Sequence, residues 1–159
     1  MIARELAPSE TAVKRLTVRQ AEMNDIDALM PLVHEHWPSL PWGHKPLNES
    51  LIRALFAWTI KGENARAWVI DDGERPQGFM ALSVFPHLYT GEPQASNPWW
   101  YVTDAARGTR ASYELLRTAE RWANEQGAVV ALSVHDEKVA KMLERMRYHR
   151  VEITLRKGV

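Results

Sequence analysis

The chain has 159 residues, of which 45% are hydrophobic and 25% are charged, and its 20 basic and 20 acidic side chains give a formal net charge of zero. This composition is typical of a globular protein with a proper core, so we expect a single domain over residues 1–159. The neutral balance argues against nucleic-acid binding, which needs a basic surplus against the phosphates. The absence of cysteine excludes disulfides, thiolate metal sites and a cysteine nucleophile.

Residues 1–14 are mostly polar and are predicted to be a partly loose lead-in. They contain no apolar stretch of the kind found in a signal peptide, and no later run is long enough to cross a bilayer. We therefore expect a cytoplasmic protein without a membrane partner.

The first half of the chain is predicted to begin with a strand over residues 16–21, where apolar and polar side chains alternate. Asn24 can cap a helix that follows, because its side chain can accept a backbone N–H of the first turn. The apolar face of that helix consists of Ile26, Leu29, Met30, Val33 and Trp37. Asn48 can cap a second helix that ends near Gly62. Its expected buried side consists of Leu51, Ile52, Leu55, Phe56 and Trp58.

The segment of residues 37–46 between these helices contains three prolines and a glycine, which exclude regular secondary structure. Its two tryptophans either cover the core or form one wall of an acceptor pocket, since aromatic side chains offer large contact areas.

Residues 65–71 and 78–85 are apolar over most of their length and are joined by an Asp-Gly turn, which predicts a hairpin buried on both faces. A polar loop is expected over residues 86–96. The strand of residues 99–102 leads into a turn and then into an amphipathic helix that stops at Gly127. The buried stripe of this helix comprises Ala111, Leu115, Leu116, Ala119, Trp122 and Ala123.

The last third of the chain begins with residues 129–134, whose continuous apolar run predicts a strand in the buried middle of a sheet. Asp136 can cap a final helix. Its core face consists of Val139, Met142, Leu143 and Met146. Residues 151–155 (VEITL) alternate and are predicted to form a closing strand. Helices interleaved with strands predict an α/β fold in which a mixed sheet carries helices on both faces.

The strand–turn–helix segment near residue 108 has the clearest chemical meaning. A helix N-terminus offers free backbone N–H groups and the positive end of the helix dipole, which together favour a phosphate. Gly108 allows a tight backbone, Thr109 and Ser112 can add hydroxyl donors, and Arg107 and Arg110 can add charge. The alternative is a solvated connector whose arginines only keep the turn soluble.

The order of elements, with Arg107-Gly108-Thr109-Arg110-Ala111-Ser112 at this junction, resembles the GNAT superfamily of N-acetyltransferases over residues 16–157. The family motif at this place is Gln/Arg-x-x-Gly-x-Gly/Ala. The resemblance implies a mostly antiparallel sheet, acetyl-CoA or another acyl-CoA as co-substrate, and no metal. It implies that these six residues hold the pyrophosphate. Backbone groups of Trp100, Tyr101 and Val102 would then hold the pantetheine arm, and one N–H there would polarise the thioester carbonyl.

Four positions depart from the family pattern. Arg110 and Ser112 replace glycines of the motif, Arg147 stands where the last helix usually ends in glycine, and Leu143 occupies the place of the usual acid, a tyrosine. Arg110 remains compatible with a helix N-terminus, because residues there have ordinary helical dihedral angles. Its side chain can face the 3′-phosphate of CoA or solvent.

The family reaction uses a base for the acceptor ammonium and an acid for the leaving thiolate. The catalytic candidates are Ser133 and His135, which lie at the end of the strand predicted over residues 129–134. His135 could act near neutral pH. His135 can equally cap the last helix beside Asp136. Tyr101 and Tyr113 are either further candidates for the acid or packed aromatics. Positioning of the substrates and an oxyanion donor can also support the reaction without a side-chain acid or base.

Another polar run, His34-Glu35-His36, is not a metal site, because adjacent residues of a helix diverge.

We therefore expect an N-acyltransferase that carries acetyl from acetyl-CoA to a primary amine of a small molecule or protein. The alternative is a degenerate domain of the same fold that acts as a non-catalytic binding or structural module. The sequence does not name the acceptor, and it leaves the oligomeric state open, with a homodimer among the options.

Overall fold

A computed structural model describes residues 14–157 of the chain. The elements are β1 (Thr17–Gln20), η1 (Met23–Asp25), α1 (Ile26–His36), η2 (Trp37–Ser39), α2 (Glu49–Lys61), β2 (Ala65–Asp71), β3 (Pro76–Pro86), β4 (Pro93–Val102), α3 (Arg110–Glu125), β5 (Val129–Ala131) and α4 (Glu137–Arg145). The predicted loose lead-in lies outside the described residues except for Lys14, which pairs with Glu74.

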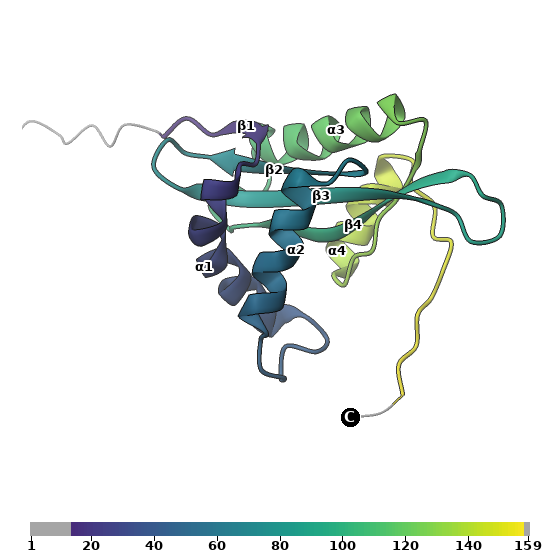
Figure 1. Cartoon of the computed structure of the whole chain (residues 1–159), viewed down its shortest axis with the longest axis horizontal. Coiled ribbons are helices and arrows are strands. Elements are labelled where there is room, and N and C mark those ends of the chain that lie inside the picture. Colours follow the sequence, from purple (N-terminus) through teal and green to yellow (C-terminus); the bar gives the residue numbers. More distant parts are fainter. Residues whose placement is uncertain (1–13, 158–159) are drawn as a thin grey trace, which may run out of the picture.

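The five strands form one sheet in the order β1-β2-β3-β4-β5. Neighbouring strands are antiparallel from β1 to β4, and only β4 and β5 are parallel. Helices α1 and α2 lie on one side of the sheet and α3 on the other (Figure 1). The predicted mixed, mostly antiparallel sheet with helices on both faces is confirmed. Among the described residues, no helix is long and apolar enough to cross a membrane.

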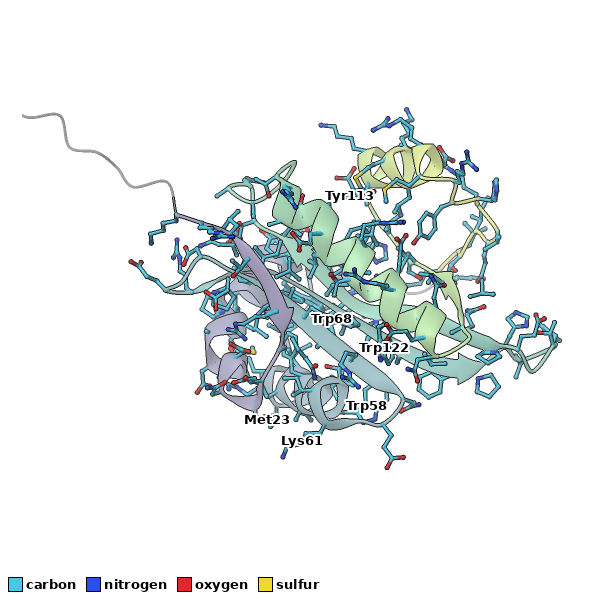
Figure 2. All side chains as sticks on the ribbon, turned by 90° about the horizontal axis from the view of Figure 1, so that it is seen from above. Met23, Trp58, Lys61, Trp68, Tyr113 and Trp122 are labelled. Atoms are coloured by element: carbon cyan, nitrogen blue, oxygen red, sulfur yellow. The ribbon has the colours of Figure 1, made fainter. Side chains whose placement is uncertain are left out.

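The sheet separates two apolar cores, because successive side chains of a strand point to opposite faces. In β2, Trp68 and Ile70 face α3, whereas Ala67 and Val69 face α1 and α2. Trp122 of α3 meets Trp68 edge-on, with ring centroids 5.7 Å apart (Figure 2). The hairpin of β2 and β3 is thus buried on both faces, as its apolar sequence predicts.

Several predicted helix ends are confirmed. The Asn48 side chain accepts the N–H of Leu51 at 3.0 Å, and the Asp136 side chain accepts the N–H of Lys138 at 2.8 Å. Gly127 follows the end of α3 with a φ of 67°, in the left-handed region that glycine adopts without strain. Every residue of the predicted α3 stripe is buried.

The N-terminus of α1 differs from the prediction, because Asn24 does not cap it. Asp25 accepts the N–H of Glu22 at 2.7 Å and binds the Arg19 guanidinium through two hydrogen bonds of 2.8 Å. The Arg19 hydrogen bonds lower the pKa of the Asp25 carboxyl. An ionised side chain with these partners organises the turn, and Asn24 remains exposed.

Two residues of α2 that were predicted to be buried are exposed, Leu51 at 54% and Trp58 at 37%. Ile52 and Phe56 are buried as predicted, and Thr59 completes the buried face. Trp58 stacks on Phe85, which projects from the far end of β3, with ring centroids 6.1 Å apart. The prediction for these two side chains was wrong because it relied on their size and apolarity alone.

Strands β4 and β5 also differ from the prediction. β4 begins at Pro93 rather than Trp99, because the last four residues of the expected polar loop, 93–96, pair with β3. β5 is an edge strand and not the middle of the sheet: among the described residues it pairs with β4 alone, and Val129 is 66% exposed. A short apolar run is compatible with both places, so its sequence could not decide between them.

The predicted closing strand over residues 151–155 is wrong for the single chain. Within residues 14–157 this segment pairs with no strand, and its apolar side chains are exposed. After α4 the chain runs away from the sheet (Figure 1). A strand needs a neighbour for its backbone hydrogen bonds, and an alternating pattern does not supply one.

Candidate functional site

The turn between β4 and α3 is held by its own backbone. The carbonyl of Thr103 accepts the N–H groups of Ala106 and Arg107 at 3.0 and 2.9 Å. Gly108 then adopts a φ of +70°, with open space where a Cβ would stand. A side chain at this position would strain the backbone, because left-handed dihedral angles are unfavourable for L-residues other than glycine.

Where this turn meets α3, the backbone N–H groups of Gly108, Arg110 and Ala111 have no acceptor within the described part of the chain. The N–H of Ser112 is taken by the side chain of Thr109 at 3.4 Å. The free groups lie at the N-terminus of α3, a helix of 16 residues whose dipole adds partial positive charge there. This arrangement is suited to an anion.

The two hydroxyl groups of the turn serve the turn itself. Thr109 Oγ1 donates to the carbonyl of Ala106 at 2.6 Å, and Ser112 Oγ donates to the carbonyl of Thr109 at 2.8 Å. Both hydroxyl hydrogens are used locally, so the groups available to an anion are backbone N–H groups.

The side chain of Arg107 is also engaged. Its Nε donates to the carbonyl of Val102 at 2.8 Å, its Nη1 pairs with Asp104 at 2.7 Å, and its guanidinium lies 5.5 Å from the centre of the Tyr101 ring. Arg107 therefore binds the end of β4 instead of extending from the turn.

Arg110 is exposed and lies beside the free N–H groups. Together with Arg15 it lines a cavity of about 520 Å³ between β1 and the start of α3, where Glu114 is the one acidic lining residue. Of the two arginines in the turn, Arg110 is thus the one placed to add positive charge to the anion site.

Strands β4 and β5 pair over only three residues, 94–96 with 129–131, and part beyond them. The side chain of Asn97 spans the strands where they part. Its Nδ2 donates to the carbonyl of Ser133 at 3.0 Å, and its Oδ1 accepts the N–H of Ser133 at 2.7 Å. This pair of hydrogen bonds closes the narrow end of the split, and it engages the backbone of Ser133.

The backbone of β4 presents polar groups to this split. Thr103 donates its N–H to the carbonyl of Gln77 at 3.0 Å, which fixes the alternation of hydrogen-bonding groups along the antiparallel pair. By this alternation the backbone of Tyr101 faces β3, whereas the N–H groups of Trp100 and Val102 face the split. Tyr101 contributes its side chain instead.

That side chain lies on the α1 side of the sheet, where Tyr101 donates its hydroxyl to Glu35 Oε1 at 2.6 Å. Burial and this hydrogen bond raise the pKa of the Tyr101 phenol, so Tyr101 stays protonated at neutral pH. Glu35 itself is exposed near the end of α1. Its carboxylate is therefore held in place and open to solvent.

His36 stacks on the ring of Tyr101, with centroids 4.6 Å apart. Burial, together with the charges of His135 and Arg107, lowers the pKa of His36, so the imidazole is neutral at neutral pH. Ser39 Oγ donates to the His36 carbonyl at 2.6 Å and lies 3.2 Å from Nδ1. The network therefore assigns the proton to Nδ1. Nε2, which has no partner among the described residues, keeps a free lone pair.

The loop after α1 reaches the segment that follows β5, where Trp42 meets the ring of His135 edge-on at 5.1 Å. His135, a predicted catalytic residue, thus lies near His36. We refer to Glu35, His36, Trp42, Tyr101 and His135 as the polar cluster.

Sequence reasoning missed Glu35 and His36 as site residues, because it considered them only as part of a metal-binding run. The two histidines do diverge: His34 Nε2 lies 2.7 Å from Glu49 Oε1, whereas His36 faces Tyr101. The available signal was their position at the end of the first helix, directly before the aromatic loop whose tryptophans either cover the core or form a wall of an acceptor pocket.

The model of the Acetyltransferase (GNAT) family matches residues 29–148. The chain belongs to the GNAT family. No curated protein matches it.

Solved structures share the GNAT fold over most of the chain. A protein of Pyrococcus furiosus is 21% identical with a TM-score of 0.73, covering 91% of this chain and all of its own. A Trypanosoma brucei acetyltransferase is 19% identical with a TM-score of 0.67 and the same coverage of 91% and 100%. An aminoglycoside acetyltransferase from an uncultured soil metagenomic sample is 14% identical with a TM-score of 0.66, covering 91% and 96%.

Two departures from the GNAT pattern now have a structural description. Arg147 adopts a φ of 70°, the left-handed conformation for which the family uses glycine. Leu143, at the place of the family tyrosine, is buried at 4% exposure in the core beside α3 and has no proton to donate.

Proposed function

We propose that this GNAT protein is an acyl-CoA-dependent N-acyltransferase that moves an acetyl group from acetyl-CoA to a primary amine. The observation that carries the proposal is the anion site at the wide end of the β4–β5 split, with the polar cluster across the sheet from it. Family membership supports an acyl-CoA co-substrate at the level of the whole family.

On the cofactor side, the N–H groups of Gly108, Arg110 and Ala111 would hold the pyrophosphate, since they lack acceptors within residues 14–157. The N–H groups of Trp100 and Val102 would bind the pantetheine arm along β4. When bound, the co-substrate supplies an activated acetyl thioester.

On the acceptor side, the Glu35 carboxylate would attract the ammonium group of the amine, and the faces of Tyr101 and Trp42 suit a cation as well. His36 then accepts a proton from the ammonium at Nε2. Its neutral state at neutral pH fits this role, because a base must arrive unprotonated.

In the reaction the amine nitrogen bonds to the acetyl carbon, the carbon–sulfur bond breaks, and the sulfur leaves with the electron pair. The nitrogen releases its second proton to solvent as the amide forms, and the thiolate takes a proton from a donor. Ser133 and His135 are the proposed donors, because both follow β5 at the split.

Acetyl-CoA titration of wild type and a matched pair of glycine variants tests the cofactor side. Gly108 and Gly91 both have positive φ, +70° and +72°, and open space at the Cβ position. Gly108→Val and Gly91→Val therefore introduce the same backbone strain, and only the first lies in the turn. We expect Gly108→Val to weaken acetyl-CoA binding by at least about tenfold and Gly91→Val to leave it unchanged.

Thiol release across a panel of primary amines, including aminoglycosides, polyamines and lysine peptides, tests the chemistry. Acetyl-CoA binding with amine-dependent thiol release supports the proposal. Absence of acetyl-CoA binding at millimolar concentration contradicts it. Binding without release for every amine would favour the non-catalytic module.

A further inference from the structure

A buried polar pair lies where β3 begins and β4 ends. Gln77 is 7% exposed, and Thr103, the residue directly after β4, is 8% exposed. The N–H of Thr103 donates to the Gln77 carbonyl at 3.0 Å, and Thr103 Oγ1 donates to Gln77 Oε1 at 3.1 Å. Buried polar groups are costly unless they are hydrogen-bonded, so these two side chains depend on the partners that they have.

The direction of the Gln77 amide is set by Asp72, in the turn between β2 and β3. Gln77 Nε2 donates to Asp72 Oδ2 at 2.9 Å. The other oxygen of Asp72 accepts the N–H groups of Arg75 and Glu74, each at 2.9 Å, and these hydrogen bonds lower the pKa of the Asp72 carboxyl. An ionised carboxylate can only accept, so it holds Nε2 of the amide toward itself and leaves Oε1 for Thr103.

The turn before α3 is built on the backbone of Thr103. Its carbonyl accepts the N–H groups of Ala106 and Arg107 at 3.0 and 2.9 Å. The carbonyl of Ala106 in turn accepts the N–H of Thr109 at 3.3 Å and its hydroxyl at 2.6 Å. Thr109 is the N-cap of α3. A continuous series of hydrogen bonds therefore runs from the β2–β3 turn to the N-terminus of α3.

We propose that Asp72, Gln77 and Thr103 are positioning residues for the anion site. They act through the backbone, because they hold the turn in the conformation that brings its free N–H groups together with those of the first residues of α3. This inference rests on the proposed function, in which these N–H groups bind the pyrophosphate of acyl-CoA. Backbone donors cannot adjust to a ligand as side chains do, so the affinity depends on how firmly the turn is held.

Threonine variants of matched chemistry test the proposal. Thr103→Val replaces the hydroxyl that binds Gln77 with a methyl group, whereas Thr103→Ser retains the hydroxyl. Thr59→Val is the control, because Thr59 is also buried and donates its hydroxyl to the Phe56 carbonyl within α2, at 3.0 Å. We expect Thr103→Val to raise the Kd for acetyl-CoA by about three- to tenfold, and the other two variants to stay within about twofold of wild type.

A truncated thioester separates this role from a general disturbance of the fold. S-acetylpantetheine lacks the pyrophosphate, so Thr103→Val should leave kcat/KM for this thioester within about twofold of wild type. With acetyl-CoA the same variant should lower kcat/KM by about three- to tenfold. An equal fall with both thioesters would overturn the proposal, because the Thr103 hydroxyl would then serve the fold or the chemistry and not the anion site.

Amide hydrogen exchange in the ligand-free protein tests the positioning without any thioester. In Thr103→Val and in Gln77→Met, the N–H groups of Ala106 and Arg107 should exchange at least about fivefold faster than in Thr59→Val. Unchanged exchange at these two groups would overturn the proposal even if wild type binds acetyl-CoA. Faster exchange in a protein that binds no acetyl-CoA would support the positioning of the turn and contradict only the proposed function.

Discussion

The two sides of the β4–β5 split are built from different kinds of groups. The proposed cofactor side consists of backbone N–H groups of Gly108, Arg110 and Ala111, within one turn of the chain. The proposed acceptor side consists of side chains brought together over long distances, as in the hydrogen bond between Glu35 and Tyr101, 66 positions apart. A backbone site depends little on which side chains flank it. A side-chain cluster depends on each of its members.

This difference explains how the turn can carry Arg110 and Ser112 where GNAT motifs use glycine. Both residues lie in α3 with its ordinary helical geometry, so neither replacement removes an N–H group. Gly108 is the exception on this side, because its φ is positive. Substitutions on the acceptor side should therefore have the larger effects on turnover.

The largest effect is expected at His36. His36→Gln removes the proposed base and should lower kcat by about 10²- to 10⁴-fold while acetyl-CoA affinity stays unchanged. His34→Gln is the matched control, because His34 lies on the same helix and points to Glu49. Steady-state kinetics and acetyl-CoA titration measure both quantities. An equal fall in the two variants would show that His36 has no special part in turnover.

The pH profile of wild type gives a second readout for His36. Because its pKa is lowered, the imidazole gains a proton only below the usual histidine range. The rate kcat/KM should stay level down to and below about pH 6.5, the ordinary histidine pKa, and should fall by about tenfold per pH unit only at lower pH. The other charged groups facing His36 are His135, Arg107 and Glu35. His36→Gln should remove this acid limb, and a limb that persists would belong to another of these groups.

A smaller effect is expected at Glu35. Glu35→Gln keeps the size of the side chain but removes its charge, and should raise KM for the amine by about tenfold, since hydrogen bonds to charged groups contribute about 1.5–3 kcal/mol. Glu49→Gln is the matched control on an exposed carboxylate nearby. Tyr101→Phe provides a further contrast, because it frees the carboxylate and should leave KM unchanged or lower it. If KM rises as much in Tyr101→Phe, the hydroxyl and not the charge binds the amine.

A still smaller effect is expected from charge on the cofactor side. Arg110→Glu should raise the acetyl-CoA Kd by about two- to fivefold in moderate salt, because an exposed charge is largely screened. Arg121→Glu makes the same change near the other end of α3 and should have no effect. Equal Kd values for both variants would place the Arg110 side chain in solvent.

The sequence predicted those parts of the molecule whose causes are local. The stripe of α3 repeats at helical spacing, and Asn48 and Asp136 cap through residues two or three positions away. The prediction that Asn24 caps α1 failed because the turn before the helix is held by Asp25, which accepts the N–H of Glu22 and binds Arg19 on a separate strand. The edge position of β5 likewise depends on which strands lie beside it, and this cannot be predicted from an apolar run in the sequence.

The site divides in the same way. The positive φ of Gly108 and the exposed position of Arg110 at the start of α3 follow from local sequence, because a tight turn before a helix is set by the residues within it. His36 could not be predicted in this way, because its stacking on Tyr101 and its nearness to His135 arise only when α1, β4 and the segment after β5 meet.

The final prediction concerns stability at two helix ends with the same geometry. α3 and α4 both end with an N–H that reaches back to the third-last helical carbonyl, Ala128 to Ala123 and Tyr148 to Leu143, each at 3.0 Å. The left-handed residue of this motif is Gly127 in α3 but Arg147 in α4, with φ values of 67° and 70°.

Arg147→Gly should therefore raise the free energy of unfolding by about 1 kcal/mol, because it relieves the strain of a side chain at positive φ. Gly127→Arg should lower it by a similar amount, and neither change reaches the polar cluster or the turn at Gly108. Urea unfolding followed by circular dichroism measures both. If Arg147→Gly is destabilising, contacts of the arginine side chain outweigh the backbone strain, and the departure from the family glycine stabilises this helix end.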